Sequence, residues 1–339
     1  MNIREAIEKL VNRVSLSETE TIAVMNQIMT GEATPLQVAS FLTALRMKGE
    51  TIEEITGAAR VMREKAHRVK VAAKTVLDTC GTGGDQKGTF NISTTCAFVV
   101  AGAGIHVAKH GNRSVSSQSG SADVLAALGV KVDAPKERVE ACIDRIGIGF
   151  LFAPLLHEAM KYAVQPRRDI GIRTIFNLLG PLTNPAMANH QLIGLYSGEL
   201  VATVAHVLKN LGSVRAMVVH GLEGLDEISL CGQTRVAELR DGEINEYMIE
   251  PEPLGLKRCN LSELQGGDAE ESARIVRRVL QGAKGPGRDV VVLNSGAALY
   301  VSGQANSIEQ GMGLAADSID KGKALEKLNE LVLMTNAAR

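Results

Sequence analysis

Apolar residues recur every three to four positions through the first 66 residues, which places them on one face of an α-helix. Ile3, Ala6 and Leu10 show this period at the start of the chain. Gly31 and Gly49 stand where helices commonly end. Residue pairs at the capping-box spacing mark three helix starts: Ser17 with Glu20, Thr34 with Gln37, and Thr51 with Glu54. This pattern predicts four short helices.

From Val76 onward, short β-branched runs alternate with amphipathic segments, which is typical of an α/β domain with a largely parallel sheet. The pair Asp241-Gly242 predicts a hairpin turn, so one edge of the sheet should be antiparallel. We therefore expect a small helical domain over 1–70 and a larger α/β domain over 71–339, with part of 155–185 packing on the helices. The expected strands are VLD (76–78), HVAK (106–109), IGFLFA (148–153), QLIGLYS (191–197), RAMVVHG (215–221) and RDVVVLN (288–294).

Composition narrows the classes of function. Lys plus Arg is 37 and Asp plus Glu is 38, a formal net charge of −1, which argues against nucleic-acid binding through bulk charge. The five cysteines are scattered and none forms a C-x-x-C pair, so neither a disulfide framework nor a structural zinc site is expected. The start of the chain has no apolar run of the signal-peptide kind, and the most apolar stretch, 96–108, is too short to cross a bilayer. The sequence predicts a cytoplasmic enzyme.

The densest chemical motif is DTCGTGGDQKGTFNIST, residues 78–94. Its glycines let backbone N–H groups approach an anion, and a helix expected to begin near Asn91 adds free donors and the positive end of its dipole. The motif is not a Walker A loop, because no G-K-S/T follows, and it lacks the acid of a dinucleotide-binding fingerprint. A plain Gly-rich turn before a helix cap is the alternative. We favour a phosphate cradle.

A second motif, KHGNRSVSSQSGSADVLAALG (109–129), follows another expected strand and precedes a helix near Ser121. Lys109 and Arg113 add positive charge, and the serines add neutral hydrogen-bond donors. An ordinary surface loop is the alternative. The carboxyl ends of neighbouring parallel strands meet at one edge of a sheet, so the two loops together could hold a doubly phosphorylated ligand.

Two adjacent acids, Asp226 and Glu227, follow the expected strand RAMVVHG. A polyphosphate needs a cation, and Mg²⁺ is usually bound by one or two carboxylates together with phosphate oxygens and water. An acidic pair in a loop is most often simply solvated. The position after a core strand and among glycines favours metal binding here.

A third motif, QPRRDIGIRTIFNLLGPLTNP (165–185), carries Arg167, Arg168 and Arg173 near a helix flanked by prolines. Arginine suits bidentate capture of a carboxylate. Surface ion pairing is the alternative for each of the three, and spacing alone does not exclude it. We expect Arg167 to begin a helical stretch after Pro166, and Arg168 and Arg173 to serve the fold.

In combination these motifs, with HGLEGLDEIS around the acidic pair, resemble the anthranilate phosphoribosyltransferase family over nearly the whole chain. The resemblance implies a helical domain joined to an α/β domain and a homodimer formed through the helical part. It also implies transfer of phosphoribosyl from phosphoribosyl diphosphate to anthranilate, the second step of tryptophan synthesis from chorismate. Mg²⁺ is the implied cofactor, with two ions when the donor is bound.

The resemblance also assigns residues to the site. Metal ligands fall on Ser93, Asp226 and Glu227. Anthranilate recognition falls on Gly81, Asn112 and Arg167. Donor contacts fall on Gly81, Gly84, Asp85, Thr89, Asn91, Ile92, Ser93, Thr94, Lys109, His110, Gly111, Asn112, Arg113, Ser114, Val115, Ser116, Ser117 and Ser121.

No nucleophile or general base is expected among these residues. The aromatic amine is neutral at pH 7, so catalysis would depend on positioning and on stabilising the diphosphate that leaves as positive charge develops on the ribose. His110 is interpreted as a structural or donor-binding residue first.

Two other functions remain open at this stage. A pyrimidine nucleoside phosphorylase would perform a related glycosyl transfer with inorganic phosphate, but KHGNR and the Asp226-Glu227 pair favour the phosphoribosyltransferase. A non-catalytic nucleic-acid-binding homologue would have a basic surface and degraded donor loops, whereas this chain has a pI near 6.7 and intact loops.

Overall fold

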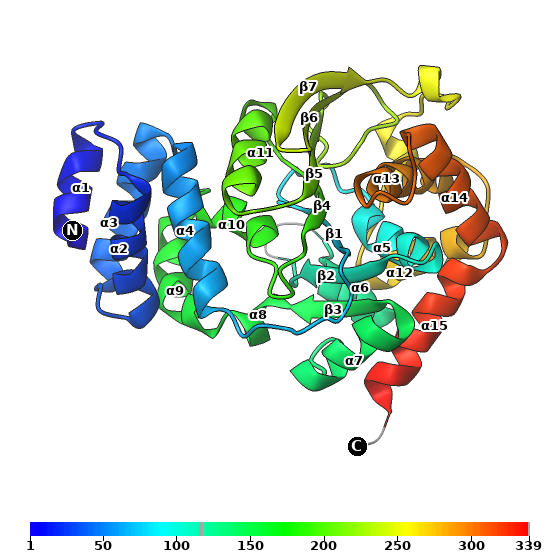
Figure 1. Ribbon diagram of the computed structural model, residues 1–339, viewed down its shortest axis with the longest axis horizontal. Helices are drawn as coiled ribbons and strands as arrows, with labels where there is room; N and C mark the ends of the chain where they lie inside the picture. Colours follow the sequence, from blue (N-terminus) through cyan, green and yellow to red (C-terminus); the bar gives the residue numbers. More distant parts are fainter. Residues whose placement is uncertain (115–117, 338–339) are drawn as a thin grey trace.

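Four helices form one end of the molecule. The computed structural model describes residues 1–114 and 118–337. Helices α1 to α4 lie side by side at the left of Figure 1 and span Ile3–Val11, Glu18–Thr30, Pro35–Lys48 and Ile52–Lys65. All three expected capping boxes form, and Gly31 ends α2 with a φ of +81°. The four predicted helices are confirmed.

The rest of the chain is built on a seven-stranded sheet of order β3-β2-β1-β4-β5-β6-β7. Strands β1 to β5 are parallel, and β6 and β7 complete an antiparallel edge. Asp241 and Gly242 join these last two strands with φ values of +53° and +80°, so the predicted hairpin is confirmed. The strands are Val76–Gly81, His106–Gly111, Ile148–Phe152, His190–Gly194, Arg215–Gly221, Thr234–Arg240 and Glu243–Ile249.

Both faces of the sheet are covered by helices (Figure 1). Successive residues of a strand point to opposite faces, and β5 shows the result: Met217 and Val219 join the apolar cluster with α5 and α13, whereas Ala216 and Val218 join the cluster with α1 to α4. The helical end and one face of the sheet therefore share a continuous core. The remaining long helices are α5 (Ile92–Gly102), α6 (Ser121–Ala127), α7 (Lys136–Ile146), α11 (Val201–Asn210), α12 (Ala269–Leu280), α13 (Pro286–Val301), α14 (Ile308–Asp320) and α15 (Lys323–Asn336).

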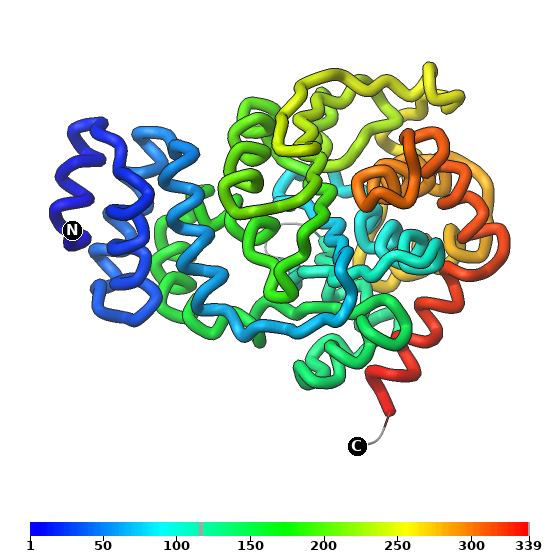
Figure 2. The backbone as a smooth tube through the Cα atoms, in the orientation of Figure 1, coloured from blue at the N-terminus to red at the C-terminus, as the bar shows by residue number. Residues whose placement is uncertain are grey.

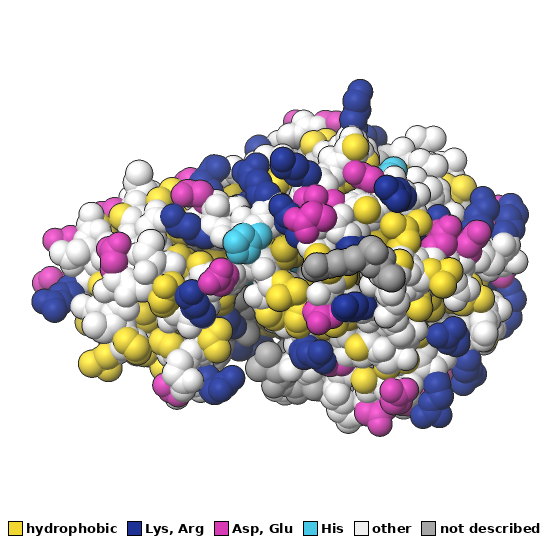
Figure 3. All heavy atoms as spheres, turned by 90° about the horizontal axis from the view of Figure 1, so that it is seen from below, with side chains coloured by type: hydrophobic (Ala, Val, Ile, Leu, Met, Phe, Trp, Pro, Cys, Tyr) yellow, Lys and Arg dark blue, Asp and Glu magenta, His cyan; other side chains and the backbone are white. Residues whose placement is uncertain are grey.

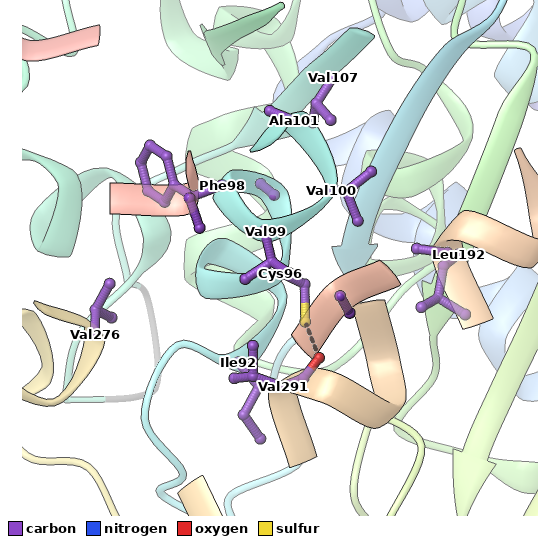
Figure 4. Close-up of a cluster of buried hydrophobic side chains, with 14 of the residues drawn as sticks. Ile92, Cys96, Phe98, Val99, Val100, Ala101, Val107, Leu192, Val276 and Val291 are labelled. Carbon is purple, nitrogen blue, oxygen red and sulfur yellow. Dashed lines mark hydrogen bonds between the residues drawn. The ribbon is translucent and has the colours of Figure 1, made fainter. Parts of the chain in front are cut away.

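Helix α5 lies at the centre of the larger apolar cluster. Its residues from Thr94 to Gly102 are all buried, and Phe98, Val99 and Val100 point in different directions into this core (Figure 4). The Cys96 thiol donates to the Val291 carbonyl oxygen of α13 at 3.6 Å. Because α5 is held on every side, its amino-terminal end is a rigid platform for the groups described below.

The expectation of a strand at RDVVVLN is wrong. These residues lie in α13, which begins with Pro286 and runs to Val301. A short apolar run cannot be assigned to strand or buried helix by periodicity alone, and every residue from Val290 to Leu299 of this helix is buried. The helix lacks an amphipathic pattern because it is surrounded by protein.

Two helices of the segment 155–185 contact the helical end of the molecule. Helix α9 (Lys161–Ile170) contacts α2 and α3, and α10 (Phe176–Leu182) contacts α4. Pro166 lies inside α9, however, and does not precede a new helix. A proline inside a helix loses one backbone hydrogen bond, and here its buried ring packs in return. Two short helical pieces, Ala153–Leu156 and Glu158–Met160, lead into α9.

Residues 66–75 connect α4 to β1 and can be followed along the lower side of Figure 2. This connection is tied down by hydrogen bonds from His67 N–H to the Leu156 carbonyl at 2.8 Å and from Val69 N–H to the Pro185 carbonyl at 3.1 Å. Among the described residues, no helix combines the length and apolar character needed to cross a membrane.

Candidate active site

Three loops meet at the carboxyl edge of the parallel strands, where ligands of α/β proteins bind. Residues 82–91 follow β1, residues 112–120 follow its neighbour β2, and residues 222–233 follow β5. The predicted adjacency of the first two loops is confirmed by the parallel pairing of β1 with β2.

The first loop and the acidic loop are in direct contact. Gly83 N–H donates to Asp226 Oδ2 at 2.8 Å. A Cβ atom on either Gly81 or Gly194 would overlap Asp226, so neither position can carry a side chain without a shift of this loop. Gly83 and Gly84 have φ values of +64° and +72°, which favour glycine. The glycines thus allow an acidic residue to lie against the ends of β1 and β4.

The carboxyl groups of Asp226 and Glu227 lie close enough to each other and to Asp85 for repulsion to disfavour their ionisation. Burial first, then repulsion from Asp85, raises the pKa of Asp226 to about 7. Burial first, then repulsion from Asp226, raises the pKa of Glu227 to about 8. Within the described residues, Asp85 Oδ2 is buried and accepts no hydrogen bond. The raised pKa values show that the protein alone does not stabilise full ionisation of Asp226 and Glu227.

That donor set fits a hard divalent cation. The carboxylates and the hydroxyl oxygen of Ser93 are all oxygen ligands, which Mg²⁺ prefers. No group of three or more His, Cys, Asp or Glu side chains encloses a metal by itself within 1–114 and 118–337. In the usual Mg²⁺ arrangement, one or two carboxylates bind the ion, and substrate phosphates and water complete its shell.

Lys109 and Ser93 connect the first two loops. Lys109 is buried, and its Nζ donates to the Thr79 carbonyl oxygen at 2.6 Å and to Ser93 Oγ at 3.4 Å. Its charge lowers the otherwise raised pKa values of Asp78 and Glu227. Lys109 lies inside β2 and not in the loop after it, because β2 extends to Gly111. The lysine therefore also neutralises buried acids.

The amino end of α5 presents several of the expected donor residues. Asn91 is the N-cap, but its side chain makes no cap hydrogen bond. Thr94 Oγ1 is buried and has no partner. Ile92 has a side chain in the core, so only its backbone could face a ligand. Thr89 pairs with Gln265 through an isolated β-bridge.

The second loop is held by an acid that the sequence analysis did not single out. Asp123 accepts from Arg113 at 2.9 Å, from Ser114 N–H at 3.0 Å and from Gly120 N–H at 3.0 Å. Asn112 is exposed, and its carbonyl accepts from Ser121 Oγ at 3.4 Å. Gly111 fits against Ser121 and Phe150, where a Cβ would overlap the serine. The expected donor contacts Val115, Ser116 and Ser117 lie outside the described residues.

Two buried histidines stand together beside this edge. The rings of His110 and His157 are 5.1 Å apart, and the Nε2 atom of each is buried with no hydrogen-bond partner in the described part of the chain. His110 Nδ1 contacts the Gly180 carbonyl oxygen at 3.0 Å. Burial lowers the pKa of His110 to about 3 and that of His157 to about 4. Both rings are neutral at pH 7. His157 was missed from the sequence because only the fold brings it to His110.

The structure places Arg167 and Arg173 of the third motif in different surroundings. Arg167 is in the last turn of α9, lies 5.1 Å from the centre of the Phe176 ring and makes no ion pair among the described residues. Burial lowers its pKa. Arg173, expected to serve the fold, donates to the Gly84 carbonyl oxygen and lies 4.3 Å from the Tyr196 ring centre. Arg173 thus contacts the loop after β1, which spacing alone did not predict.

A fourth segment supports the first loop and has no motif of its own. Gly266 N–H donates to the Gly88 carbonyl at 2.8 Å, and Phe90 N–H donates to the Leu264 carbonyl at 3.0 Å. Gln265 donates to the Lys87 carbonyl at 2.9 Å. Segment 264–266 is remote in sequence and was not predicted.

Comparison with known proteins agrees with this geometry. Residues 73–325 match the a/b domain of a glycosyl transferase family, and residues 4–66 match the helical bundle domain of a glycosyl transferase family. Anthranilate phosphoribosyltransferase of Geotalea uraniireducens is 56% identical over 348 residues, which cover 98% of this chain and 99% of the relative. The chain belongs to the anthranilate phosphoribosyltransferase family. The Acetivibrio thermocellus member is 55% identical, with 99% of this chain and 97% of that protein covered.

Solved structures of the anthranilate phosphoribosyltransferase family share the whole fold. The Thermus thermophilus enzyme has a TM-score of 0.93 and 45% identity, with 98% of this chain and 99% of that chain covered. The Saccharomyces cerevisiae enzyme in complex with PRPP and Mg has a TM-score of 0.91 and 29% identity, with 99% and 98% covered. A further yeast structure contains 4-fluoroanthranilate.

Proposed function

We propose that this protein transfers the phosphoribosyl group from phosphoribosyl diphosphate to anthranilate, giving N-(5-phosphoribosyl)anthranilate and diphosphate. The observation that carries the proposal is the acidic pair Asp226-Glu227 held directly against the glycine loop after β1. Donor amides for phosphate and carboxylates for a cation stand there side by side, as a diphosphate leaving group requires. The yeast relative in complex with PRPP and Mg supports the same ligands.

Different residues of the chain bind the phosphates and the metal ion. Backbone amides of the glycine loop and the amino end of α5 bind phosphate oxygens, and Lys109 supplies positive charge beside Ser93. Asp226, Glu227 and Ser93 Oγ hold Mg²⁺. When bound, Mg²⁺ supplies the positive charge that stabilises the departing diphosphate. The proposal includes two Mg²⁺ ions when the donor is bound.

Anthranilate, the acceptor, needs to be bound and oriented by the protein but not activated by it. Arg167 has an uncompensated charge and binds the anthranilate carboxylate, with Gly81 and Asn112 completing that subsite. The rings of His110 and His157 are neutral at pH 7 and add no positive charge to the site. The amine attacks the anomeric carbon without a general base.

The assembly and domain division are part of the same proposal. Residues 1–70 form the helical domain and 71–339 the α/β domain, and two copies associate through the helical part. Exposed apolar side chains on its surface support this, among them Val11, Leu36 and Met47. Sedimentation of wild type and a Leu36→Lys variant tests the interface. A monomeric wild type would refute the dimer. The cytoplasmic location stays a prediction.

One assay tests the function. Anthranilate fluorescence should fall only when donor and Mg²⁺ are both present, and chelation with EDTA should stop the loss. Nucleoside plus phosphate is the control pair of substrates, and turnover with it alone would refute the proposal. A nucleic-acid mobility shift serves as a second control. Basic and acidic side chains are interspersed on the face shown in Figure 3, and no shift is expected.

A further inference from the structure

A buried asparagine lies directly behind the acidic loop. Asn294 is in the middle of α13 and is fully buried. Its Oδ1 accepts from the Ile228 N–H at 2.9 Å, and its Nδ2 donates to the Ile228 carbonyl at 2.8 Å and to the Val290 carbonyl at 2.9 Å. Both amide protons and the amide oxygen are therefore used, and two of the three bonds go to one residue.

These two bonds clamp the residue that follows Glu227. A single hydrogen bond would allow Ile228 to rotate about it, whereas simultaneous contact with the N–H and the C=O of Ile228 restricts rotation as well as position. The Ile228 side chain is itself buried in the core beside α13. Ile228, which follows Glu227, is thus held through its backbone N–H and C=O groups and through its buried side chain.

The acidic side chains are held from the opposite direction by the first loop and by the amino end of α5. Ser93 N–H donates to Glu227 Oε1 at 3.0 Å, and Gly83 N–H donates to Asp226 Oδ2 at 2.8 Å. Each of these bonds is made by an exposed or partly exposed residue at the site, where a ligand can compete for it. The Asn294 bonds lie in the core and have no such competitor. They set where the two carboxylates stand when the loops bind ligand.

We propose that Asn294 is a positioning residue that places Asp226 and Glu227 for a divalent cation, an inference that rests on the proposed function. The residue acts through Ile228 and touches no substrate atom. Removing its amide leaves a buried N–H and a buried C=O without partners, which costs stability as well as position. A test must therefore separate the two effects.

The chain offers a matched control at the other end of the sheet. Asn189 makes the same kind of two-point contact, since its Oδ1 accepts from Val76 N–H at 3.0 Å and its Nδ2 donates to the Lys74 carbonyl at 2.8 Å. Val76 begins β1, whereas the site lies beyond the residue that ends it. Asn189→Ala should lower the melting temperature without a change in metal use.

The experiment compares Asn294→Ala and Asn189→Ala with wild type at 20 °C. Two quantities are measured: the Mn²⁺ dissociation constant in the presence of diphosphate, by electron paramagnetic resonance, and the Mg²⁺ concentration that gives half-maximal turnover. For Asn294→Ala both should rise about tenfold, with the anthranilate KM within twofold of wild type and kcat largely recovered at saturating Mg²⁺. Asn189→Ala should leave both unchanged.

An unchanged Mn²⁺ affinity in Asn294→Ala, or an equal change in Asn189→Ala, would overturn the positioning role. If the alanine variant does not fold, Asn294→Leu fills nearly the same volume without the hydrogen bonds and is read by the same criteria. The Mn²⁺ and diphosphate measurement does not need turnover. A wild type without anthranilate turnover would therefore refute the proposed function, while the binding data would still decide the role of Asn294.

Discussion

The backbone N–H of Ser93 donates to the Glu227 carboxylate at 3.0 Å, across 134 positions of sequence. This bond joins the amino end of α5 to the loop after β5. A helix amino terminus stabilises negative charge, yet burial still raises the pKa of Glu227 to about 8. The bond holds the Glu227 carboxyl group in place, and a cation bound beside it would favour the ionised form.

Replacing both acids should separate stability from activity. Asp226→Asn with Glu227→Gln removes two carboxyl groups that are costly to ionise, so the metal-free variant should melt no lower than wild type at pH 8. Turnover should fall at least a hundredfold at ordinary Mg²⁺ and recover in part at high Mg²⁺. Calorimetry and a Mg²⁺ titration of the rate measure the two effects. An unchanged rate at limiting Mg²⁺ would contradict the metal assignment.

The histidine pair should make the protein sensitive to acid. The folded-state pKa values of His110 and His157, about 3 and about 4, lie below the ordinary value of 6.5. The unfolded chain therefore takes up protons first as the pH falls, and stability present above pH 6.5 is lost between about pH 6.5 and 4.

His157→Gln removes one of these titrating groups and should flatten the decline. Melting temperatures at half-unit steps of pH compare the variant with wild type. His206→Gln, on the outer side of α11, is the control and should keep the wild-type slope. If the melting temperatures of wild type and His157→Gln decline in parallel as the pH falls, His157 does not cause the acid sensitivity.

The two residues that join the loops should differ in their effect on stability. Ser93→Ala removes only a hydroxyl at the site and should weaken use of the donor while leaving the melting temperature near wild type. Lys109→Met also removes the charge that offsets Asp78 and Glu227, so it should lower the melting temperature and raise the donor KM roughly tenfold or more. In both variants anthranilate binding should be spared. Unchanged donor affinity in both would refute the two-loop cradle.

Arg167→Ala should weaken anthranilate specifically. A charge-assisted hydrogen bond contributes about 1.5–3 kcal/mol, and 1.4 kcal/mol is a factor of ten, so the anthranilate KM should rise about ten- to a hundredfold with little change in donor KM. Exposed Arg168 is the matched control, and Arg168→Ala should change neither constant. Arg173 is unsuitable as a control because it contacts the Gly84 carbonyl. A sharply lower melting temperature with normal anthranilate KM would make Arg167 structural.

Local signals predicted the parts of this fold that depend on nearby residues. The capping boxes at Ser17, Thr34 and Thr51 formed because each bond closes within three residues. The hairpin at Asp241 formed because Asp-Gly accepts positive φ values. The glycine loop after β1 and the helix that follows it could also be predicted from the sequence. A backbone that approaches another group closely requires glycine, and this requirement is visible in the local sequence.

Features that depend on residues far apart in the sequence could be seen only in the tertiary structure. The run RDVVVLN became a helix because it is enclosed on all sides, and burial on all sides erases the periodicity that distinguishes helix from strand. Arg173 reached Gly84 and His157 reached His110 only through the folding of segment 155–185 onto the site. The sequence by itself determined which groups could bind phosphate and metal. The fold decided which of them meet, because hydrogen bonds such as those of Asn294 with Ile228 join residues that no local pattern relates.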